Sequence, residues 1–330
     1  MDTRRLILLM VFLFSSFMLW ENWQKYNAPK PAPVAAAQGE AGAAVPQPSA
    51  ALQAATPGAA PAAPAATAPA AGETFTVTTD LVKATISAQG GDIVGLELLN
   101  YREHDDKKKV FQLFDPKHSY TAQSGLIGPG LPNHRTQMVR VPGPTEMADG
   151  SDELRIRLEA PAQNGVKAAK VLTFRRGSYV VDVAWEIANE GEKPLVTHAY
   201  YQLQRDGAAP AGETMMVSTF TGPAVFSEAE KYQKVTFDEV GSGKAKFAKT
   251  ADNGWLAMVQ HYFVSAIVPK EGVSREYYMR KVEGQNLYQT GVIMPVAEIP
   301  PGAKGGSSVA LFAGPQEQAA LKKLAPASPR

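Results

Sequence analysis

One run of residues decides the fold class of this chain. It reads Tyr179-Val180-Val181-Asp182-Val183-Ala184-Trp185-Glu186-Ile187. Large apolar side chains occupy every second position, and the positions between them are mostly small or charged. Because successive side chains of a β-strand point to opposite faces of a sheet, this period of two predicts a strand with one buried face.

The same alternation recurs along most of the chain, including residues 74–77 and 154–158. Further strands are predicted over residues 83–87, 93–99, 110–114, 137–141, 168–174, 197–205, 256–268, 276–282, 287–294 and 308–312. Turns rich in glycine and proline, such as Gly90-Gly91, separate these runs. Many short strands with almost no helix between them predict an all-β fold, a large antiparallel β-sandwich over residues 73–313.

The composition excludes several classes of protein. The chain has 330 residues, with 33 basic and 32 acidic side chains and a formal net charge of +1. A nucleic-acid-binding protein would carry a basic excess, so no nucleic-acid partner is expected. Without a single cysteine, the chain can form no disulfide framework, thiol nucleophile, iron–sulfur cluster or cysteine zinc site.

The N-terminal segment, residues 1–27, has the pattern of a membrane anchor. Its apolar part, about residues 6–23, would span roughly 27 Å as a helix, close to the thickness of a bilayer core. Arg4 and Arg5 precede this part, which places the N-terminus in the cytoplasm, and Trp20 and Trp23 lie at the far end, as in an aromatic belt. A cleaved signal peptide is the alternative, but the bulky residues after the run offer no cleavage site.

The two segments that flank the predicted sandwich have compositions of their own. Residues 28–72 are an Ala/Pro-rich linker, and prolines that recur every few residues block helical turns, so a disordered tether is predicted. Residues 314–330 are interpreted as a C-terminal helix, over residues 316–324, and a truncated end.

The sequence shows no pattern typical of an active site. Its histidines lack the spacing of a metal pair, and it contains neither a G-x-G-x-x-G nor a G-x-S-x-G motif. We therefore predict no catalytic residues, no cofactor, no metal and no enzymatic activity. The basic run Lys107-Lys108-Lys109 is interpreted as a solvated turn, with contact to anionic lipid headgroups as the alternative.

A dense block of aromatic and small residues covers positions 254–266. It reads Gly254-Trp255-Leu256-Ala257-Met258-Val259-Gln260-His261-Tyr262-Phe263-Val264-Ser265-Ala266. This block closely resembles a signature of the YidC family of bacterial membrane protein insertases. The opening Met-Asp-x-x-Arg before an apolar helix that ends in Trp-x-x-Trp resembles the family as well, as do residues 90–93 and 311–315.

Large apolar residues on a strand usually pack in a core, so the block is interpreted as a family signature with a structural role. The residues to which this interpretation applies are Gly254, Trp255, Gln260, His261, Tyr262 and Phe263.

The resemblance implies a first transmembrane helix, a tether and a large periplasmic domain, held at the bacterial inner membrane. That domain would be a β-supersandwich similar to the mutarotase-like, sugar-binding folds. Complete proteins of the family assist the insertion, folding and assembly of membrane proteins, alone or beside the Sec translocon. The implied partners are therefore nascent membrane proteins, Sec translocon components and the lipid bilayer.

The family's insertion machinery lies in five further transmembrane helices, and no second apolar run occurs in these 330 residues. The sequence is therefore expected to be a fragment or a truncated gene product, or else the insertion core lies on another chain. In each case this chain would supply the anchor and a domain for docking partners.

Two other functions stay open at the level of sequence. The implied fold also suits a membrane-tethered periplasmic carbohydrate-binding or mutarotase-like domain. Such a domain would need a histidine, either His198 or His261, to meet a carboxylate in an open cleft. A structural tether without any ligand is the third hypothesis.

Overall fold

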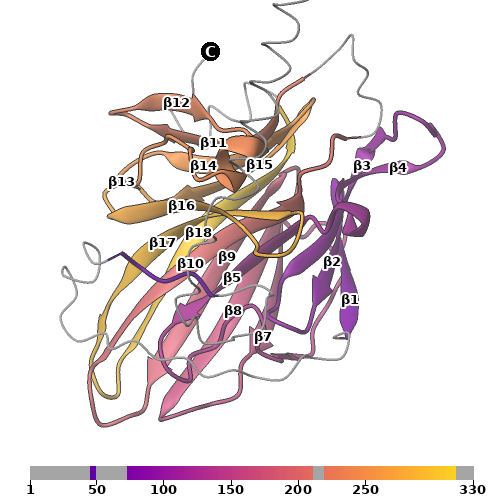
Figure 1. The fold of residues 1–330 in the computed structure, drawn as a ribbon. Helices are drawn as coiled ribbons and strands as arrows, with labels where there is room; N and C mark the ends of the chain where they lie inside the picture. Colours follow the sequence, from indigo (N-terminus) through magenta and orange to yellow (C-terminus); the bar gives the residue numbers. More distant parts are fainter. Residues whose placement is uncertain (1–44, 50–72, 211–218, 317–330) are drawn as a thin grey trace, which may run out of the picture. The chain divides into compact units, whose positions relative to one another are not determined.

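The computed structural model describes residues 45–49, 73–210 and 219–316, and more than half of them belong to two β-sheets (Figure 1). The strands of sheet 1 are β1 (Thr74–Thr78), β2 (Val82–Ser87), β3 (Ile93–Arg102), β4 (Val110–Phe114), β5 (Thr121–Ile127), β10 (Leu195–Asp206), β13 (Thr250–Ala251), β16 (Arg275–Lys281) and β17 (Leu287–Ile299). The strands of sheet 2 are β6 (Val139–Arg140), β7 (Glu153–Glu159), β8 (Val166–Arg175), β9 (Val180–Asn189), β11 (Thr221–Ser227), β12 (Lys231–Lys234), β14 (Trp255–Gln260), β15 (Phe263–Pro269) and β18 (Lys304–Pro315). Two short helices, η1 (Pro116–His118) and α3 (Phe237–Gly241), are the only helices in the described ranges.

Both sheets are antiparallel throughout the named strand pairs. Sheet 1 has the order β1-β2-β3-β5-β10-β17-β16-β13, with β4 paired to β3 outside this path. Sheet 2 has the order β12-β11-β14-β15-β18-β9-β8-β7-β6. The predicted all-β, two-sheet antiparallel sandwich is therefore confirmed.

The core is built from the inward-facing residues of both sheets. On β9, Val181, Val183 and Trp185 are buried, whereas Glu186 on the opposite face is exposed. They belong to one apolar cluster with residues of sheet 1 such as Leu203. Each large side chain buried in this way contributes roughly 1.5–3 kcal/mol, so the alternation in sequence is what holds the two sheets together.

A buried ion pair crosses the core between the sheets. Lys170 of β8 places its Nζ 3.1 Å from the Asp92 carboxylate, next to β3, and donates to the Ser124 carbonyl of β5 at 3.3 Å. Trp185 donates from its indole Nε1 to the Ser124 hydroxyl at 3.1 Å. Burial raises the pKa of the Asp92 carboxyl to about 6, although the neighbouring lysine acts in the opposite direction. Burial also lowers the pKa of Lys170, so for both charges the loss of solvation exceeds the gain from pairing.

The prediction of one strand over residues 256–268 is wrong. Strand β14 ends at Gln260 and β15 begins at Phe263, so the two form a hairpin. His261 adopts a φ of +43° at the turn, a conformation uncommon for residues other than glycine. Strand β18 also runs to Pro315, past the boundary predicted at residue 313, because Pro315 lies opposite Phe263.

The predicted anchor over residues 6–23, with Arg4, Arg5, Trp20 and Trp23, lies outside the described residues. The same is true of the helix predicted at 316–324, except for Gln316, which is not helical. Within the residues that the structure describes, no helix has the length and hydropathy needed to cross a membrane.

Five residues of the predicted disordered linker, Val45–Ser49, are described and lie against sheet 1. Pro46 and Pro48 are buried, and the Ser49 backbone N–H donates to a Glu276 carboxylate oxygen at 2.9 Å. The segment is the short indigo piece in Figure 1. The prediction of disorder therefore does not hold for this stretch, and the rest of the linker lies outside the described residues.

Candidate functional site

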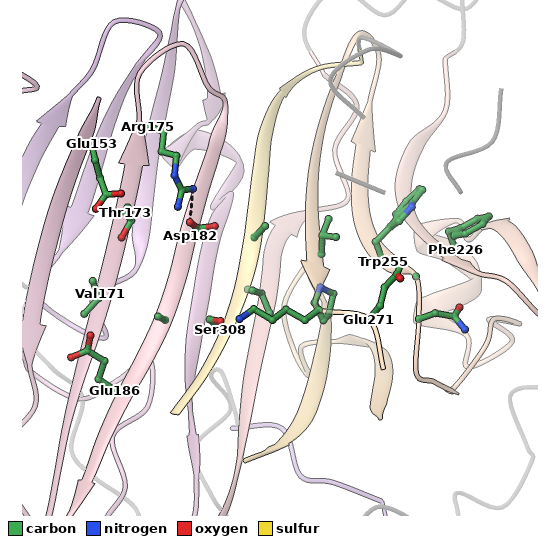
Figure 2. A pocket seen from close by; sticks show the side chains of 18 of the residues that line it. Glu153, Val171, Thr173, Arg175, Asp182, Glu186, Phe226, Trp255, Glu271 and Ser308 are labelled. Carbon is green, nitrogen blue, oxygen red and sulfur yellow. Dashed lines mark ion pairs between the residues drawn. The ribbon is translucent and has the colours of Figure 1, made fainter. Parts of the chain in front are cut away.

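The outer face of sheet 2 carries an open hollow of about 590 Å³ (Figure 2). Its floor crosses four neighbouring strands, β8, β9, β18 and β15, and consists largely of small or apolar side chains, among them Val171, Ala184, Ala310 and Val268. Figure 2 shows Ser308 of β18 near the middle of the hollow, with the Arg175–Asp182 ion pair on one side and Trp255 and Phe226, together with Glu271, on the other. Small outward-facing residues on adjacent strands leave this space, because no large side chain covers the sheet there.

The charged side of the hollow is formed by β7, β8 and β9. Arg175 and Asp182 form an ion pair with 2.5 Å between Nη1 and Oδ2. Glu186 pairs with Arg157 at the same distance, and Arg155 lies 3.4 Å from the Glu153 carboxylate. These charges are therefore largely compensated by one another.

The aromatic side of the hollow belongs to a second apolar cluster, on the outer face of β11, β14, β15 and β18. Trp255 stacks on Phe226, with ring centroids 5.8 Å apart and planes 18° apart. The Trp255 indole N–H has no hydrogen-bond partner among the described residues. Trp255 is thus one residue of the predicted signature that reaches a candidate site.

The hollow has the chemistry of a contact surface. Its acidic side chains are exposed or paired, and in the described part of the chain no three histidines or carboxylates lie close enough together to hold a metal ion. The stacked rings of Trp255 and Phe226 beside a rim of paired charges suit a polypeptide surface, because aromatic residues are enriched in protein interfaces and their rims are polar. Neither the charged side nor the aromatic side of the hollow was predicted from the sequence. The small residues at outward-facing positions of β9 and β18 are the pattern that could have indicated the hollow.

Gly254, next to Trp255 in the predicted signature, is held at the edge of the hollow by a buried arginine. Arg275 of β16 donates to the Gly254 carbonyl at 3.0 Å and to the Asp252 carbonyl at 2.8 Å. It also donates to the carbonyls of Val273 and Lys270. One guanidinium thus ties the loop before β14 to the loop after β15.

Gln260, at the end of β14, faces the core and contacts the opposite sheet. Its Oε1 accepts a hydrogen bond of 2.7 Å from Arg205 of β10. The Arg205 guanidinium lies 5.5 Å from the centroid of the Tyr120 ring and also donates to the Ala208 carbonyl at 2.8 Å. The contact is a further polar link between the two sheets.

The remaining signature residues form the tip and base of the β14–β15 hairpin. Tyr262 is 69 % exposed, so it does not pack in the core as the sequence predicted. The His261 Nδ1 atom lies 2.7 Å from the Thr219 hydroxyl oxygen. The His261 carbonyl accepts a hydrogen bond of 3.0 Å from the Gln316 side chain. Phe263 is buried and stacks on Phe111 of β4, with centroids 4.0 Å apart.

His198 and His261, the two histidines required by the carbohydrate hypothesis, lie in different sheets. His198 is buried on β10 of sheet 1, whereas His261 is at the hairpin turn of sheet 2. Burial lowers the pKa of His198, and the negative charge of Glu276 opposes that change. The run Lys107-Lys108-Lys109 is exposed in the turn between β3 and β4, as predicted.

Comparison with known protein families identifies one match that covers most of the chain. Residues 74–328 match the model of the YidC periplasmic domain. The chain is 68 % identical over 328 residues to the membrane protein insertase YidC of Dechloromonas aromatica, covering 99 % of this chain and 59 % of that protein. Its identity is 51 % with the YidC of Aromatoleum aromaticum and 46 % with that of Thiobacillus denitrificans, over 99 % of this chain and 60 % and 59 % of those proteins.

Comparison with solved structures gives matches of low sequence identity. A galactose mutarotase-related enzyme from Lactobacillus acidophilus has a TM-score of 0.47 at 8 % identity, over 73 % of this chain and 97 % of that one. A putative aldose 1-epimerase from Escherichia coli K12 has a TM-score of 0.42 at 10 % identity, over 73 % of this chain and 98 % of that one.

The chain spans about 60 % of the length of the curated relatives it matches. The match to the family model covers both sheets, from the first residue of β1 to beyond the end of β18. The chain therefore belongs to the YidC family of membrane protein insertases and carries the periplasmic domain of that family.

Proposed function

We propose that this chain supplies the membrane anchor and the partner-docking periplasmic domain of a membrane protein insertase, and catalyses no chemical reaction. The observation that carries the proposal is the family match over residues 74–328. Its relatives are named membrane protein insertases, and the chain corresponds to about 60 % of their length. The insertion step is assigned to the remaining part of those proteins.

In this proposal residues 6–23 cross the inner membrane, and the sheets stand on the periplasmic side. Arg4 and Arg5 lie in the cytoplasm, and Trp20 and Trp23 lie at the outer interface of the bilayer. The partners are nascent membrane proteins and components of the Sec translocon, with no nucleic acid. Insertion is driven by transfer of apolar segments out of water, at roughly 25 cal/mol per Å², so no nucleotide is hydrolysed.

The hollow on sheet 2 is the proposed docking surface for a protein partner. Its small-residue floor supports this assignment, because a partner side chain can approach the sheet backbone there. The exposed ion pairs at its edge suit a polar rim of the kind that surrounds protein interfaces.

Reconstitution into liposomes tests whether insertion depends on the part of the relatives that this chain does not cover. We expect the purified 330-residue chain to insert no more of a model membrane protein into liposomes than empty liposomes do. A chain extended by the remaining part of a relative should restore insertion. Insertion by the 330-residue chain alone would contradict the proposal.

Substitution in the hollow tests the docking surface. In the extended protein, Ala184→Trp fills the floor of the hollow, and we expect it to reduce cross-linking to translocon subunits several-fold. Ala162→Trp is the matched control, since Ala162 is exposed and lies outside this hollow. Equal losses of cross-linking in both variants, or no loss in either, would place the docking surface elsewhere.

A further inference from the structure

The outer face of sheet 1 carries a flat aromatic platform where β5, β10, β17 and β16 lie side by side. Tyr200 of β10 lies opposite Gly125 of β5 and Ile293 of β17. Tyr278 of β16 lies opposite Gly291. A Cβ atom at either glycine would collide with the neighbouring tyrosine ring, so each ring occupies the space above a glycine and lies along the sheet.

Hydrogen bonds hold both rings of this platform in place. The Tyr200 hydroxyl accepts from the His134 backbone N–H at 3.1 Å, and it lies 2.5 Å from Nδ1 of the same histidine. The Tyr278 hydroxyl donates to Gln202 Oε1 at 2.6 Å, and Gln202 Nε2 donates to Gln123 Oε1 at 2.7 Å. A surface fixed in this way loses little entropy when it binds a ligand.

Residues Val45–Ser49, with the sequence Val-Pro-Gln-Pro-Ser, cover part of this platform. Val45 packs against the cluster of Tyr200 and Ile293, together with Tyr278. Pro46 and Pro48 are buried, whereas Gln47 between them is exposed, so the segment is extended with both prolines directed inward. Its far end is fixed by the 2.9 Å hydrogen bond from the Ser49 N–H to Glu276.

Proline explains why the segment lies on the face of the sheet rather than along an edge. A proline has no N–H to donate to a strand ladder, but its ring packs well against aromatic and apolar surfaces. Its fixed φ also means that little conformational entropy is lost on binding. An extended Pro-x-Pro segment is therefore well suited to bind a surface formed by tyrosine rings.

We propose that the outer face of sheet 1 at Tyr200, Tyr278 and Glu276 is a binding site for an extended, proline-containing peptide, and that Val45–Ser49 of the tether occupies it in cis. Docking there shortens the free tether to residues 28–44, which can span at most about 60 Å. The whole of residues 28–72 could span up to about 160 Å. The occupied site thus limits how far the domain can move from the membrane.

The absence of cysteine makes a direct distance measurement possible in the full chain. Spin labels at Gln47→Cys and Glu298→Cys, both exposed positions, report the separation of the tether from sheet 1. In detergent micelles we expect one narrow distance distribution. Pro46→Ser with Pro48→Ser should convert most of it to a broad distribution, and Glu276→Gln should increase the broad fraction several-fold.

The matched controls are the prolines nearer the anchor and a carboxylate outside the platform. Pro31→Ser with Pro33→Ser removes another Pro-x-Pro pair from the same tether, and Glu283→Gln changes an exposed carboxylate in the turn before β17. Both controls should retain the narrow distribution. A broad distribution in the unsubstituted chain, or the same broadening in the controls, would overturn the proposal.

A synthetic peptide of residues 41–53 tests the site in trans. Because a tethered segment competes at an effective concentration near the millimolar range, the peptide should bind the Pro46→Ser, Pro48→Ser chain at least ten-fold more tightly than the unsubstituted chain. A peptide with both prolines replaced by serine should lose this binding. Equal binding of the two peptides would refute the site, and neither measurement depends on insertion activity.

Discussion

At the scale of single residues, Gly254 shows why one position of the signature tolerates no side chain. It has a φ of +83°, and a Cβ atom there would overlap the backbone carbonyl of Phe226 on the neighbouring strand β11. The carbonyl cannot move, because Phe226 is paired with Trp255 in the ladder. Gly254 therefore determines how β14 enters sheet 2.

Replacement of Gly254 should consequently destabilise the domain strongly. We expect Gly254→Ala to lower the free energy of unfolding by about 2–4 kcal/mol, the sum of a positive-φ penalty and a backbone clash. Gly243→Ala is the matched control, since Gly243 has a φ of +70° but nothing within 4 Å of the added Cβ. Urea unfolding should show a loss of only about 1–2 kcal/mol there. Equal losses would mean that the close approach contributes nothing.

The two adjacent residues His261 and Tyr262 show where sequence reasoning fails at this scale. They lie in a run that is mostly apolar or aromatic, and residues 255–263 contain no glycine, proline or asparagine, so the usual turn residues are missing there. The turn is set by the pairing of β14 with β15 and by Gln316, which donates to the carbonyls of His261 and Phe263. The structural role predicted for the signature stays a prediction that the variants test.

At the scale of elements, the β14–β15 hairpin of sheet 2 meets the β3–β4 hairpin of sheet 1 through one side chain. Phe263 stacks on Phe111 with planes 15° apart, and its ring meets Tyr101 edge-on with centroids 5.3 Å apart. Phe263 also lies opposite Pro315 at the end of β18. One phenyl ring thus joins two hairpins and the last described strand.

Removal of that ring should loosen the β3–β4 hairpin. We expect Phe263→Ala to cost about 3–5 kcal/mol of stability and to accelerate amide exchange in β4, because Phe111 loses its stacking partner. Tyr262→Ala, one residue away but exposed, should change stability by no more than about 0.5 kcal/mol. If exchange in β4 were unchanged by Phe263→Ala, the contact between the hairpins would not hold them.

Strands with a regular alternation of apolar and polar residues could be predicted from the sequence, and strands without it could not. Strands β7 and β9 alternate cleanly and were predicted, whereas β5 and β11 were not. Gly125 interrupts β5, where the Tyr200 ring fills the space of the missing side chain. Strand β11 contains Gly222-Pro223. The Pro223 carbonyl accepts from the Val235 N–H at 2.9 Å, but proline has no N–H to donate in return, and the paired residues of β11 and β12 begin at Ala224.

At the scale of the whole molecule, several polar contacts join the sheets through the apolar core. They include the Lys170–Asp92 pair, the hydrogen bond from Trp185 to Ser124 and the Arg205–Gln260 hydrogen bond. Both side chains of the ion pair are almost completely buried. Since burial opposes the charged form of each partner, we expect the pair to contribute more to the alignment of the sheets than to net stability.

A double substitution separates these two contributions. Asp92→Asn leaves the Lys170 ammonium buried without its counter-charge, and we expect a loss of about 3–5 kcal/mol in urea unfolding. Lys170→Met alone should cost a similar amount for the opposite reason. The combined variant should recover most of the loss, because no unpaired charge remains. Additive losses in the combined variant would mean that the two side chains act independently, and would contradict a coupled ion pair.

The architecture was foreseeable from the sequence to the level of a two-sheet sandwich, but its functional surfaces were not. The hollow brings together Ala184, Ser308 and Trp255, which are separated by more than fifty residues along the chain. The platform under Val45–Ser49 likewise depends on β5, β10, β16 and β17 lying side by side. The alternation of apolar and polar residues predicts which face of a sheet a residue occupies. Its neighbours on that face depend on the order of the strands, which cannot be derived from a single sequence.

The position of β18 in sheet 2 has a consequence for how the domain forms during synthesis. It is the last described strand, yet it lies between β15 and β9 and is the sole link between the two halves of that sheet. At roughly 5–20 residues per second, several seconds pass between completion of β9 and the arrival of residues 304–315. Until then the facing edges of β9 and β15 are unpaired, so the nascent domain passes through an open intermediate in which those edges must be kept from pairing with other chains.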